Sequence, residues 1–299
     1  MTRNFQSGKP KLACEIAADR VIAARVSDSR QVLELCSTSE LAPGCVVPDL
    51  TESNLRQPDA VVGALREVLG NVSSRSRDVT AVLPDAAVRV ALLDFETLPA
   101  KRDEAEGVIR FRLRKSLPFD VDKASVSYQA QTSNGAVRVV AAVVLKSVIE
   151  EYESVIREAG FNPGVVLPSM LAAVCGAPGD RGTLVVKVDA RTTSIAILDQ
   201  QQLLLVRTLE NASGVTISGE QLAEDVYPSV VFFQDTYNTN IEEIFVSGIS
   251  DVSTVASSLQ AQTGAEVKEL VRASQLGLGG GSIPKWRMAG VVGALLNTN

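Results

Sequence analysis

The fold is decided by the stretch LVVKVDARTTSIAIL, Leu184–Leu198. An apolar run, a short polar turn at 189–192 and a second alternating run together predict a β-hairpin. An equivalent stretch, LACEIAADRVIAARV, occupies Leu12–Val26 and superposes on the first without a gap. A third predicted strand follows each hairpin, at Val32–Thr38 and at Leu203–Leu209. Two three-stranded units of one design predict a duplicated, two-lobed α/β chain with its cleft between the lobes.

This pair of hairpins resembles the actin-like superfamily, in which the two hairpin turns face each other and hold the phosphates of ATP. The resemblance implies a turn that contains an aspartate and a glycine. The glycine lets backbone N–H groups approach the phosphates, and the aspartate serves the metal shell or orients water. The four equivalent positions in this chain are Glu15, Ala17, Lys187 and Asp189. Only Glu15 is chemically close to the usual residue.

The other three substitutions weigh against a bound nucleotide. A carboxylate at Asp189 would lie beside a phosphate, and like charges about 4 Å apart repel by about 4 kcal/mol at an effective dielectric constant near 20. Lys187 cannot ligate Mg²⁺, and Ala17 adds a methyl group to a turn that usually has none. The remaining vestigial cleft positions are Thr192, Thr193 and Gly248. We therefore expect no cofactor, no metal and no catalytic residue in this cleft, with ATP and Mg²⁺ as the alternative.

Composition excludes several classes of function. The 299 residues include no histidine, which removes Ser-His-Asp and Cys-His catalysis and histidine-ligated metal sites. A formal net charge of −6 without a long basic run makes nucleic acid a poor partner. No apolar run is long enough to cross a membrane, and the polar segment 1–10 is expected to be a disordered tail rather than a signal peptide. Four cysteines without metal or redox spacing fit a reduced, cytosolic chain.

A strand–helix–strand–strand–helix block interrupts the first lobe at 85–160. Its predicted elements are Val88–Leu93, Arg102–Leu117, Ala124–Gln131, Val137–Leu145 and Lys146–Ala159. The passage KSLPFD at Lys115–Asp120, followed by VSYQ at Val126–Gln129, resembles the inserted 1C subdomain of the type IV pilus assembly protein PilM family. Cell-division FtsA shares the general layout but fits the Pro-Phe passage less well.

The resemblance implies an actin-like (ribonuclease-H-like) α/β fold in three parts. Lobe 1, which is 1A-like, would comprise 11–84 and 161–178, the 1C-like insertion 85–160, and the 2A-like lobe 2 residues 179–299. Relatives carry a further subdomain, 2B, before the long helix predicted here at Gly219–Tyr237. Only Glu210–Gln221 occupies that interval, so we expect 2B to be missing.

The glycine-rich segment Gly277–Ser282 (GLGGGS) is not expected to bind phosphate. It lacks the GxxxxGK[ST] pattern, and no Lys-Ser or Lys-Thr pair follows its glycines. A flexible connector to the last helix is the simpler interpretation.

By resemblance, the chain would be a cytoplasmic scaffold of a type IV pilus or related secretion machine. In the PilM family, subdomains 1A and 1C form a groove for the N-terminal cytoplasmic tail of PilN, an inner-membrane protein. The chain would then be peripheral to the inner membrane through this partner, without inserting into the membrane itself, and pilus motor components would be further candidate partners. Groove residues chosen by location and apolarity are Leu92, Phe95, Phe111, Leu117 and Phe119. Core packing is the alternative for each of them, and a solvated face is the alternative for the arginine-rich helix around Arg110–Lys115.

Two rival functions stay open. One is an active ATPase or kinase of the same superfamily, which saturable binding of Mg-ATP would favour. The other is the cytoplasmic part of the type II secretion protein GspL, which shares the fold. GspL continues into a transmembrane helix, and FtsA into an amphipathic tail; neither is expected after Leu296.

Overall fold

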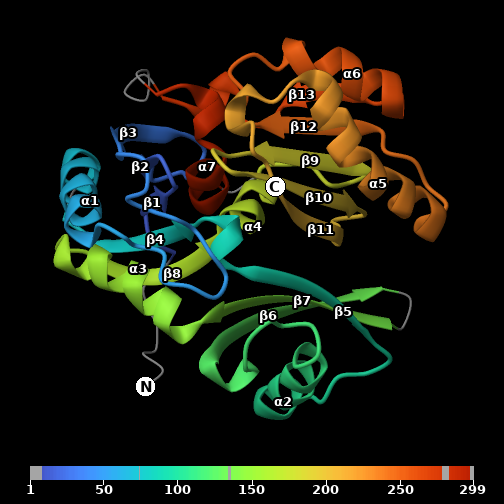
Figure 1. The fold of residues 1–299 in the computed structure, drawn as a ribbon, viewed down its shortest axis with the longest axis horizontal. Helices are drawn as coiled ribbons and strands as arrows, with labels where there is room; N and C mark the ends of the chain where they lie inside the picture. The colour runs from blue at the N-terminus through green and yellow to red at the C-terminus, as the bar shows by residue number, and fades with distance from the viewer. Residues whose placement is uncertain (1–8, 74, 134–135, 278–282, 297–299) are drawn as a thin grey trace.

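Two five-stranded sheets of the same design form the frame of the molecule (Figure 1). The computed structural model describes residues 9–73, 75–133, 136–277 and 283–296. In lobe 1 the strand order is β3-β2-β1-β4-β8. These strands are β1 (Leu12–Ile16), β2 (Arg20–Val26), β3 (Leu33–Glu40), β4 (Asp78–Leu83) and β8 (Asn162–Pro168).

Lobe 2 repeats this order as β11-β10-β9-β12-β13. Its strands are β9 (Thr183–Val188), β10 (Thr192–Asp199), β11 (Gln202–Glu210), β12 (Glu243–Ser247) and β13 (Glu266–Glu269). In each sheet the first hairpin strand is central, with its hairpin partner antiparallel on one side and a parallel strand on the other. The predicted duplication and the gapless alignment of the two hairpins are confirmed.

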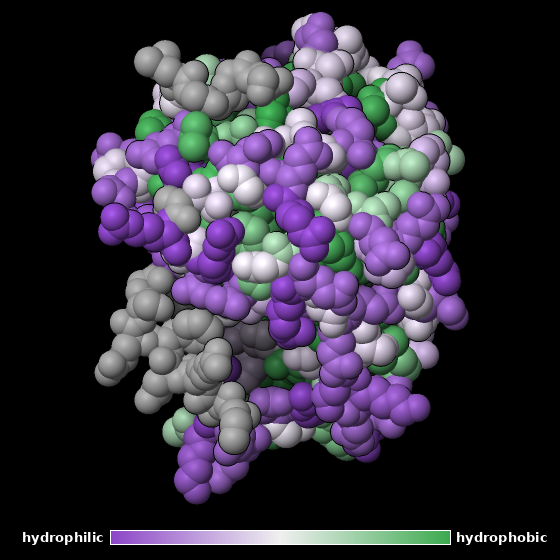
Figure 2. All heavy atoms as spheres, turned by 90° about the vertical axis from the view of Figure 1, so that its left-hand side faces the viewer, coloured by the Kyte–Doolittle hydropathy of each residue, from purple (hydrophilic) through white to green (hydrophobic). Residues whose placement is uncertain are grey.

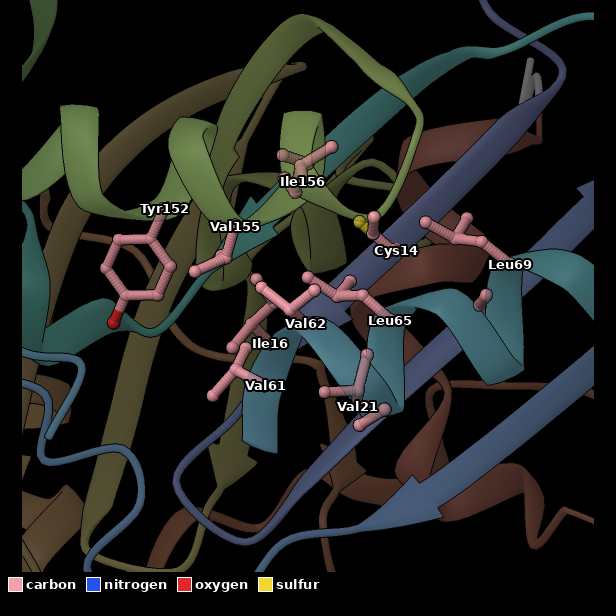
Figure 3. Packing of buried hydrophobic residues seen from close by; sticks show 14 of the residues in the cluster. Cys14, Ile16, Val21, Val61, Val62, Leu65, Leu69, Tyr152, Val155 and Ile156 are labelled. Atoms are coloured by element: carbon pink, nitrogen blue, oxygen red, sulfur yellow. The ribbon is translucent and has the colours of Figure 1, made fainter. Parts of the chain in front are cut away.

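Helices α1 (Pro58–Val72) and α3 (Lys146–Glu158) cover the outer face of the lobe 1 sheet. Figure 3 shows Tyr152, Val155 and Ile156 of α3 packed over the apolar face of α1 and over Cys14 and Ile16 of β1. The apolar spacing of both helices places these side chains on one face, where burial of each stabilises the lobe by about 1.5–3 kcal/mol. We expected 146–159 to belong to the insertion, but the structure places this helix on lobe 1.

The outer face of lobe 2 is covered by α5 (Gly219–Tyr237) and α6 (Ser253–Thr263). Two short helices, α4 (Ser169–Val174) and α7 (Ala289–Leu295), lie between the two sheets, with α7 beside α4 and the lobe 1 strands (Figure 1). A β-carbon on Gly293 of α7 would lie 1.9 Å from the Ala172 carbonyl oxygen, so only glycine permits this approach to α4. Although we placed residues 179–299 in lobe 2, α7 therefore packs on lobe 1.

A third sheet, of order β5-β7-β6, builds the insertion. Its elements are β5 (Arg89–Phe95), α2 (Arg102–Leu113), β6 (Ala124–Ser133) and β7 (Ala136–Leu145). Ile109 and Leu113 of α2 are buried against one face of this sheet. On the other side Arg138 of β7 donates a hydrogen bond to Tyr237 Oη of α5 at 2.8 Å, which ties the insertion to lobe 2.

Helix α2 ends at Leu113 rather than at Leu117 as predicted, because Ser116 N–H bonds to the Leu113 carbonyl in a turn before Pro118. A loop with a single 3₁₀ turn, Gly214–Thr216, joins β11 to α5. The glycines expected to form a connector lie almost wholly outside the described residues.

None of the helices in the described ranges has the length and apolarity needed to span a bilayer. Figure 2 shows a face on which hydrophilic side chains predominate and apolar ones are scattered.

Candidate functional site

The two hairpin turns face each other across the cleft between the lobes. Each closes on itself in the same way: Ala17 N–H bonds to the Arg20 carbonyl at 2.9 Å, and Asp189 N–H bonds to the Thr192 carbonyl at 2.8 Å. The turns border a cavity of about 690 Å³, which also reaches the loop after β3 and the end of β11. This cavity occupies the place where the resemblance put a nucleotide.

Lys187 lies at the base of this cleft with its ammonium group between the two lobes. It forms an ion pair with Asp189 of its own lobe. Its Nζ lies 3.8 Å from Glu15 Oε1 on β1 and 3.9 Å from Asp85 Oδ2 after β4. The Lys187 side chain is only 4% exposed, so one buried cation of lobe 2 is shared by two carboxylates of lobe 1.

A second buried cation crosses the cleft in the opposite direction. Arg20 of lobe 1 approaches Asp189 of lobe 2, with 3.5 Å between Arg20 Nη2 and Asp189 Oδ1. Its Nη1 donates to Asp19 at 2.7 Å, and its side chain is also 4% exposed. Asp189 therefore contacts one cation from each lobe.

Hydroxyl and amide donors complete the network. Asp85 accepts hydrogen bonds from Met170 N–H at 2.7 Å and from Ser194 Oγ of lobe 2 at 2.9 Å. Glu15 Oε1 accepts one from Ser169 Oγ at 2.5 Å. Buried polar groups cost free energy unless they find partners, and these contacts supply partners for most of them.

Burial and charge shift the pKa values of these groups in different directions. Burial raises the pKa values of the Glu15 and Asp85 carboxyls, and nearby Lys187 only partly opposes it. Burial would also raise the pKa of Asp189, but Lys187 and Arg20 together hold it below its usual value. Burial would lower the pKa of Lys187, yet Asp189, Glu15 and Asp85 raise it above its ordinary value. Lys187 and Asp189 therefore stay ionised at neutral pH.

One oxygen of Glu15 has no such partner. Its side chain is nearly fully buried, and Oε2 has no hydrogen-bond partner among the described residues. A β-carbon on Gly290 of α7 would lie 2.5 Å from this oxygen. The carboxyl group therefore fits only because α7 has a glycine there.

The residues present do not fit a magnesium nucleotide. One N–H group in each turn, that of Ala17 and that of Asp189, is used within its hairpin, and the Thr193 hydroxyl accepts a hydrogen bond from Asn211 Nδ2 at 3.1 Å. Thr192 lines the cavity, beside the carboxylate of Asp189. Where a metal would need carboxylates, the Lys187 ammonium already lies, and within the described chain we find no group of acidic or cysteine side chains suited to a metal ion.

Local backbone geometry explains why position 248 is a glycine. Its φ is +87°, a left-handed conformation that glycine tolerates best, and an added β-carbon would lie 1.7 Å from the Val188 carbonyl oxygen. Its N–H bonds to the Trp286 carbonyl at 2.8 Å. The close approach of Gly248, just after β12, to the end of the neighbouring strand β9 therefore accounts for this glycine without a nucleotide.

The five groove candidates have different packing environments. Leu92 packs against the apolar cluster between the lobes, whereas Phe95, Leu117 and Phe119 pack partly against the cluster under α2. Phe111 is separate from both, because 69% of its surface is exposed on α2.

Sequence reasoning missed Arg20, Asp85 and Ser169, and it considered Ser194 only as a phosphate contact. Asp85 had a usable signal: it follows a buried strand, β4, which pairs in parallel with β1, and the carboxyl ends of parallel strands meet at one edge. Arg20 gave no comparable signal, because a charged residue in a turn is ordinarily solvated. Ser169 and Ser194 reach the network only through the packing of α4 and β10.

No model of a known protein family matches the sequence, and no curated protein is similar to it. Solved structures do resemble it. The structure of the "PilM-PilN type IV pilus biogenesis complex" matches with a TM-score of 0.79 and 19% identity, over 96% of this chain and 98% of the other. The cytoplasmic domain of EpsL, an inner membrane component of the type II secretion system of Vibrio cholerae, matches with a TM-score of 0.51 and 12% identity, over 79% and 80% of the two chains. The ethanolamine utilization protein EutJ from Carboxydothermus hydrogenoformans matches with a TM-score of 0.51 and 10% identity, over 96% and 89%.

At these identities the likeness shows the fold. It confirms the actin-like, two-lobed α/β fold with an inserted 1C-like subdomain that the sequence led us to expect, and the resemblance to PilM.

Proposed function

We propose that this protein is an actin-like scaffold of a type IV pilus or related secretion machine that works without hydrolysing nucleotide. It would lie in the cytoplasm, peripheral to the inner membrane, and bind the N-terminal cytoplasmic tail of a PilN-like inner-membrane protein. The observation that carries the proposal is the Lys187 ammonium between Glu15, Asp85 and Asp189. An internal cation holds the two lobes together where the superfamily uses a magnesium nucleotide.

Electrostatics supports this interpretation. A nucleotide phosphate at the Asp189 turn would approach an ionised carboxylate, and at about 4 Å the repulsion is about 4 kcal/mol at an effective dielectric constant near 20. The cross-lobe ion pairs also make a ligand unnecessary for closure, because Lys187 and Arg20 each connect one lobe to the other. A shape fixed in this way suits a docking platform.

The partner is proposed from the fold and from the surface of the insertion. The matching PilM structure was solved as a complex with PilN, and the two chains align over nearly their full lengths. On α2 of this protein, Phe111 is 69% exposed, and Val108 one turn earlier is 38% exposed. Exposed apolar side chains on one helix face can anchor an extended peptide. We place the docking contact there, with Phe111 as its anchor.

Isothermal titration calorimetry with Mg-ATP tests the nucleotide part of the proposal. We expect no saturable heat, whereas binding with one-to-one stoichiometry would favour the rival, an active ATPase.

Fluorescence anisotropy with a labelled peptide of the PilN-like tail tests the partner. We expect saturable binding that Phe111→Ser weakens by about tenfold or more, since a buried Phe side chain contributes about 1.5–3 kcal/mol. Phe232→Ser is the matched control, because Phe232 is 52% exposed on α5, outside the insertion. Equal losses in both variants, or no binding to the unmodified protein, would contradict the proposed contact. Binding of a type II secretion tail instead would favour the GspL-like alternative.

A further inference from the structure

The cavity between the hairpin turns keeps a ligand-sized volume although its chemistry no longer suits a phosphate. Its volume of about 690 Å³ lies within the roughly 300–1,000 Å³ of small-molecule sites. We infer that it binds an organic cation, an ammonium or guanidinium group on an aliphatic stem. The inference goes beyond the scaffold function and does not require it.

Charge around the cavity favours a cation. Four carboxylates line it, from Glu15, Asp49, Asp189 and Glu210. Among the described lining residues Arg191 is the one cation. The buried cations beneath the turns are already engaged with Asp189. An anion would therefore meet net negative charge, and a cation would meet attraction.

Two of these carboxylates stand at the cavity from opposite lobes. Asp49, in the loop after β3, accepts hydrogen bonds from Thr51 N–H at 2.7 Å and Glu52 N–H at 2.9 Å. These bonds lower its pKa, so it is ionised at neutral pH. These two bonds and a third, from the Thr51 hydroxyl at 2.9 Å, all reach Asp49 Oδ1. Asp49 Oδ2 accepts no hydrogen bond within the described structure. Glu210 ends β11 in lobe 2 and is exposed.

The floor of the cavity supplies an independent indication. Glu15 lines it, is 97% buried, and holds an oxygen, Oε2, that no described residue satisfies. A buried acceptor without a partner costs about 1–3 kcal/mol, which a donor from a ligand would relieve. An ammonium or guanidinium group brings several N–H donors.

The rest of the lining selects an organic cation over a metal ion. Its apolar part comprises Ile16, Ala17, Ala18, Val47, Pro48, Leu50, Pro84, Ala86, Ala190 and Ala212. Such a surface matches an aliphatic stem rather than a hydrated ion. In agreement, the described acidic side chains form no cluster of metal-binding geometry.

Titration calorimetry at fixed ionic strength with agmatine, Mg²⁺ and Mg-ATP tests the inference. Of these three ligands, we expect only agmatine to bind saturably, with one-to-one stoichiometry. Acetyl-Leu-Arg-Leu-amide is the second arm: tighter binding than agmatine identifies a basic side chain of a partner as the source, and weaker binding identifies a free amine. Absence of agmatine and peptide binding would overturn the inference and leave the scaffold untouched, whereas Mg-ATP binding would contradict both.

Variants locate the site. Asp49→Asn and Glu210→Gln should each weaken agmatine binding by up to about fivefold, the range of an exposed ion pair. Glu224→Gln on α5 is the matched control, since Glu224 is exposed and is not among the residues that line the cavity. An equal loss with Glu224→Gln, or unchanged affinity in the first two variants, would assign the binding to general surface charge and refute the site.

Discussion

Replacing Lys187 with methionine tests the buried cross-lobe network most directly. Methionine keeps most of the side-chain length but removes the charge. Glu15, Asp85 and Asp189 would then face one another without the cation that now lies within 3.9 Å of the first two and in contact with the third. Removal of one partner from a buried ion pair costs about 3–5 kcal/mol. That is a large part of the 5–15 kcal/mol that typically holds a domain folded.

The assay is urea unfolding followed by circular dichroism at pH 8 and at pH 5. We expect Lys187→Met to lower the free energy of unfolding by about 3–5 kcal/mol at pH 8. Without the cation, the folded-state pKa values of Glu15 and Asp85 rise further, and that of Asp189 loses the largest influence that now lowers it. A group whose folded pKa lies above its unfolded pKa stabilises the fold at low pH and loses that contribution as pH rises through the folded value. The deficit should therefore be smaller at pH 5.

Lys101→Met is the matched control, because the Lys101 side chain is 82% exposed and pairs with Glu104 on the surface. Its expected cost is at most about 0.5 kcal/mol at either pH. A loss below about 1 kcal/mol for Lys187→Met, or a deficit equal at both pH values, would refute the view that this lysine neutralises buried carboxylates.

Three further outcomes are expected. Gly290→Ala places a methyl group 2.5 Å from Glu15 Oε2 and should lower the free energy of unfolding in urea by about 1–3 kcal/mol. Gly63→Ala in α1 is its control: the new methyl group has open space around it, so the change should be neutral or stabilising by up to about 1 kcal/mol. The pKa of Glu15 is raised in the folded state, so its contribution to stability is present below the unfolded pKa and is lost as pH rises through the folded pKa. Glutamine cannot ionise, so between pH 5 and pH 8 Glu15→Gln should lose less free energy of unfolding than the unmodified protein. Parallel curves of unfolding free energy against pH for the two proteins would contradict this. Arg138→Met removes the bonds to Asp94 and Tyr237 and should increase hydrogen exchange in β5–β7 while leaving β9 protected; unchanged exchange in the insertion would show that this contact does not hold it.

Much of the fold could be predicted because its signals are local. The alternation in LACEI and LVVKV, and the turn residues after each, require only neighbours along the chain. The predicted boundaries of helices and domains were wrong where a turn or a tertiary contact decided them. Helix α2 stops at Leu113 although its apolar period continues to Leu117. Helix α3 follows the insertion in sequence but belongs by packing to lobe 1.

The candidate site, like the fold, could be predicted only in part from the sequence. Alignment of the two hairpins identified Glu15, Lys187 and Asp189, because duplication makes equivalent positions visible in the sequence. It could not show that Arg20 crosses to Asp189, or that Asp85 and Ser194 meet between the lobes. Those contacts join residues far apart in the chain, and only the assembled lobes bring them together.

Local patterning along the chain thus accounts for the repeated hairpins and the inserted block. It also shows a lysine and an aspartate where a nucleotide-binding chain would have an acid and a glycine. The tertiary structure decided what those substitutions do. The packing of α4 and α7 between the sheets helps to bury the side chains of Glu15, Asp85 and Lys187 beneath the turns. This burial makes the Lys187 ammonium an internal cation that both lobes share. The physical reason is that periodicity is a property of neighbouring residues, whereas desolvation and cross-lobe charge pairing are properties of the whole packed molecule.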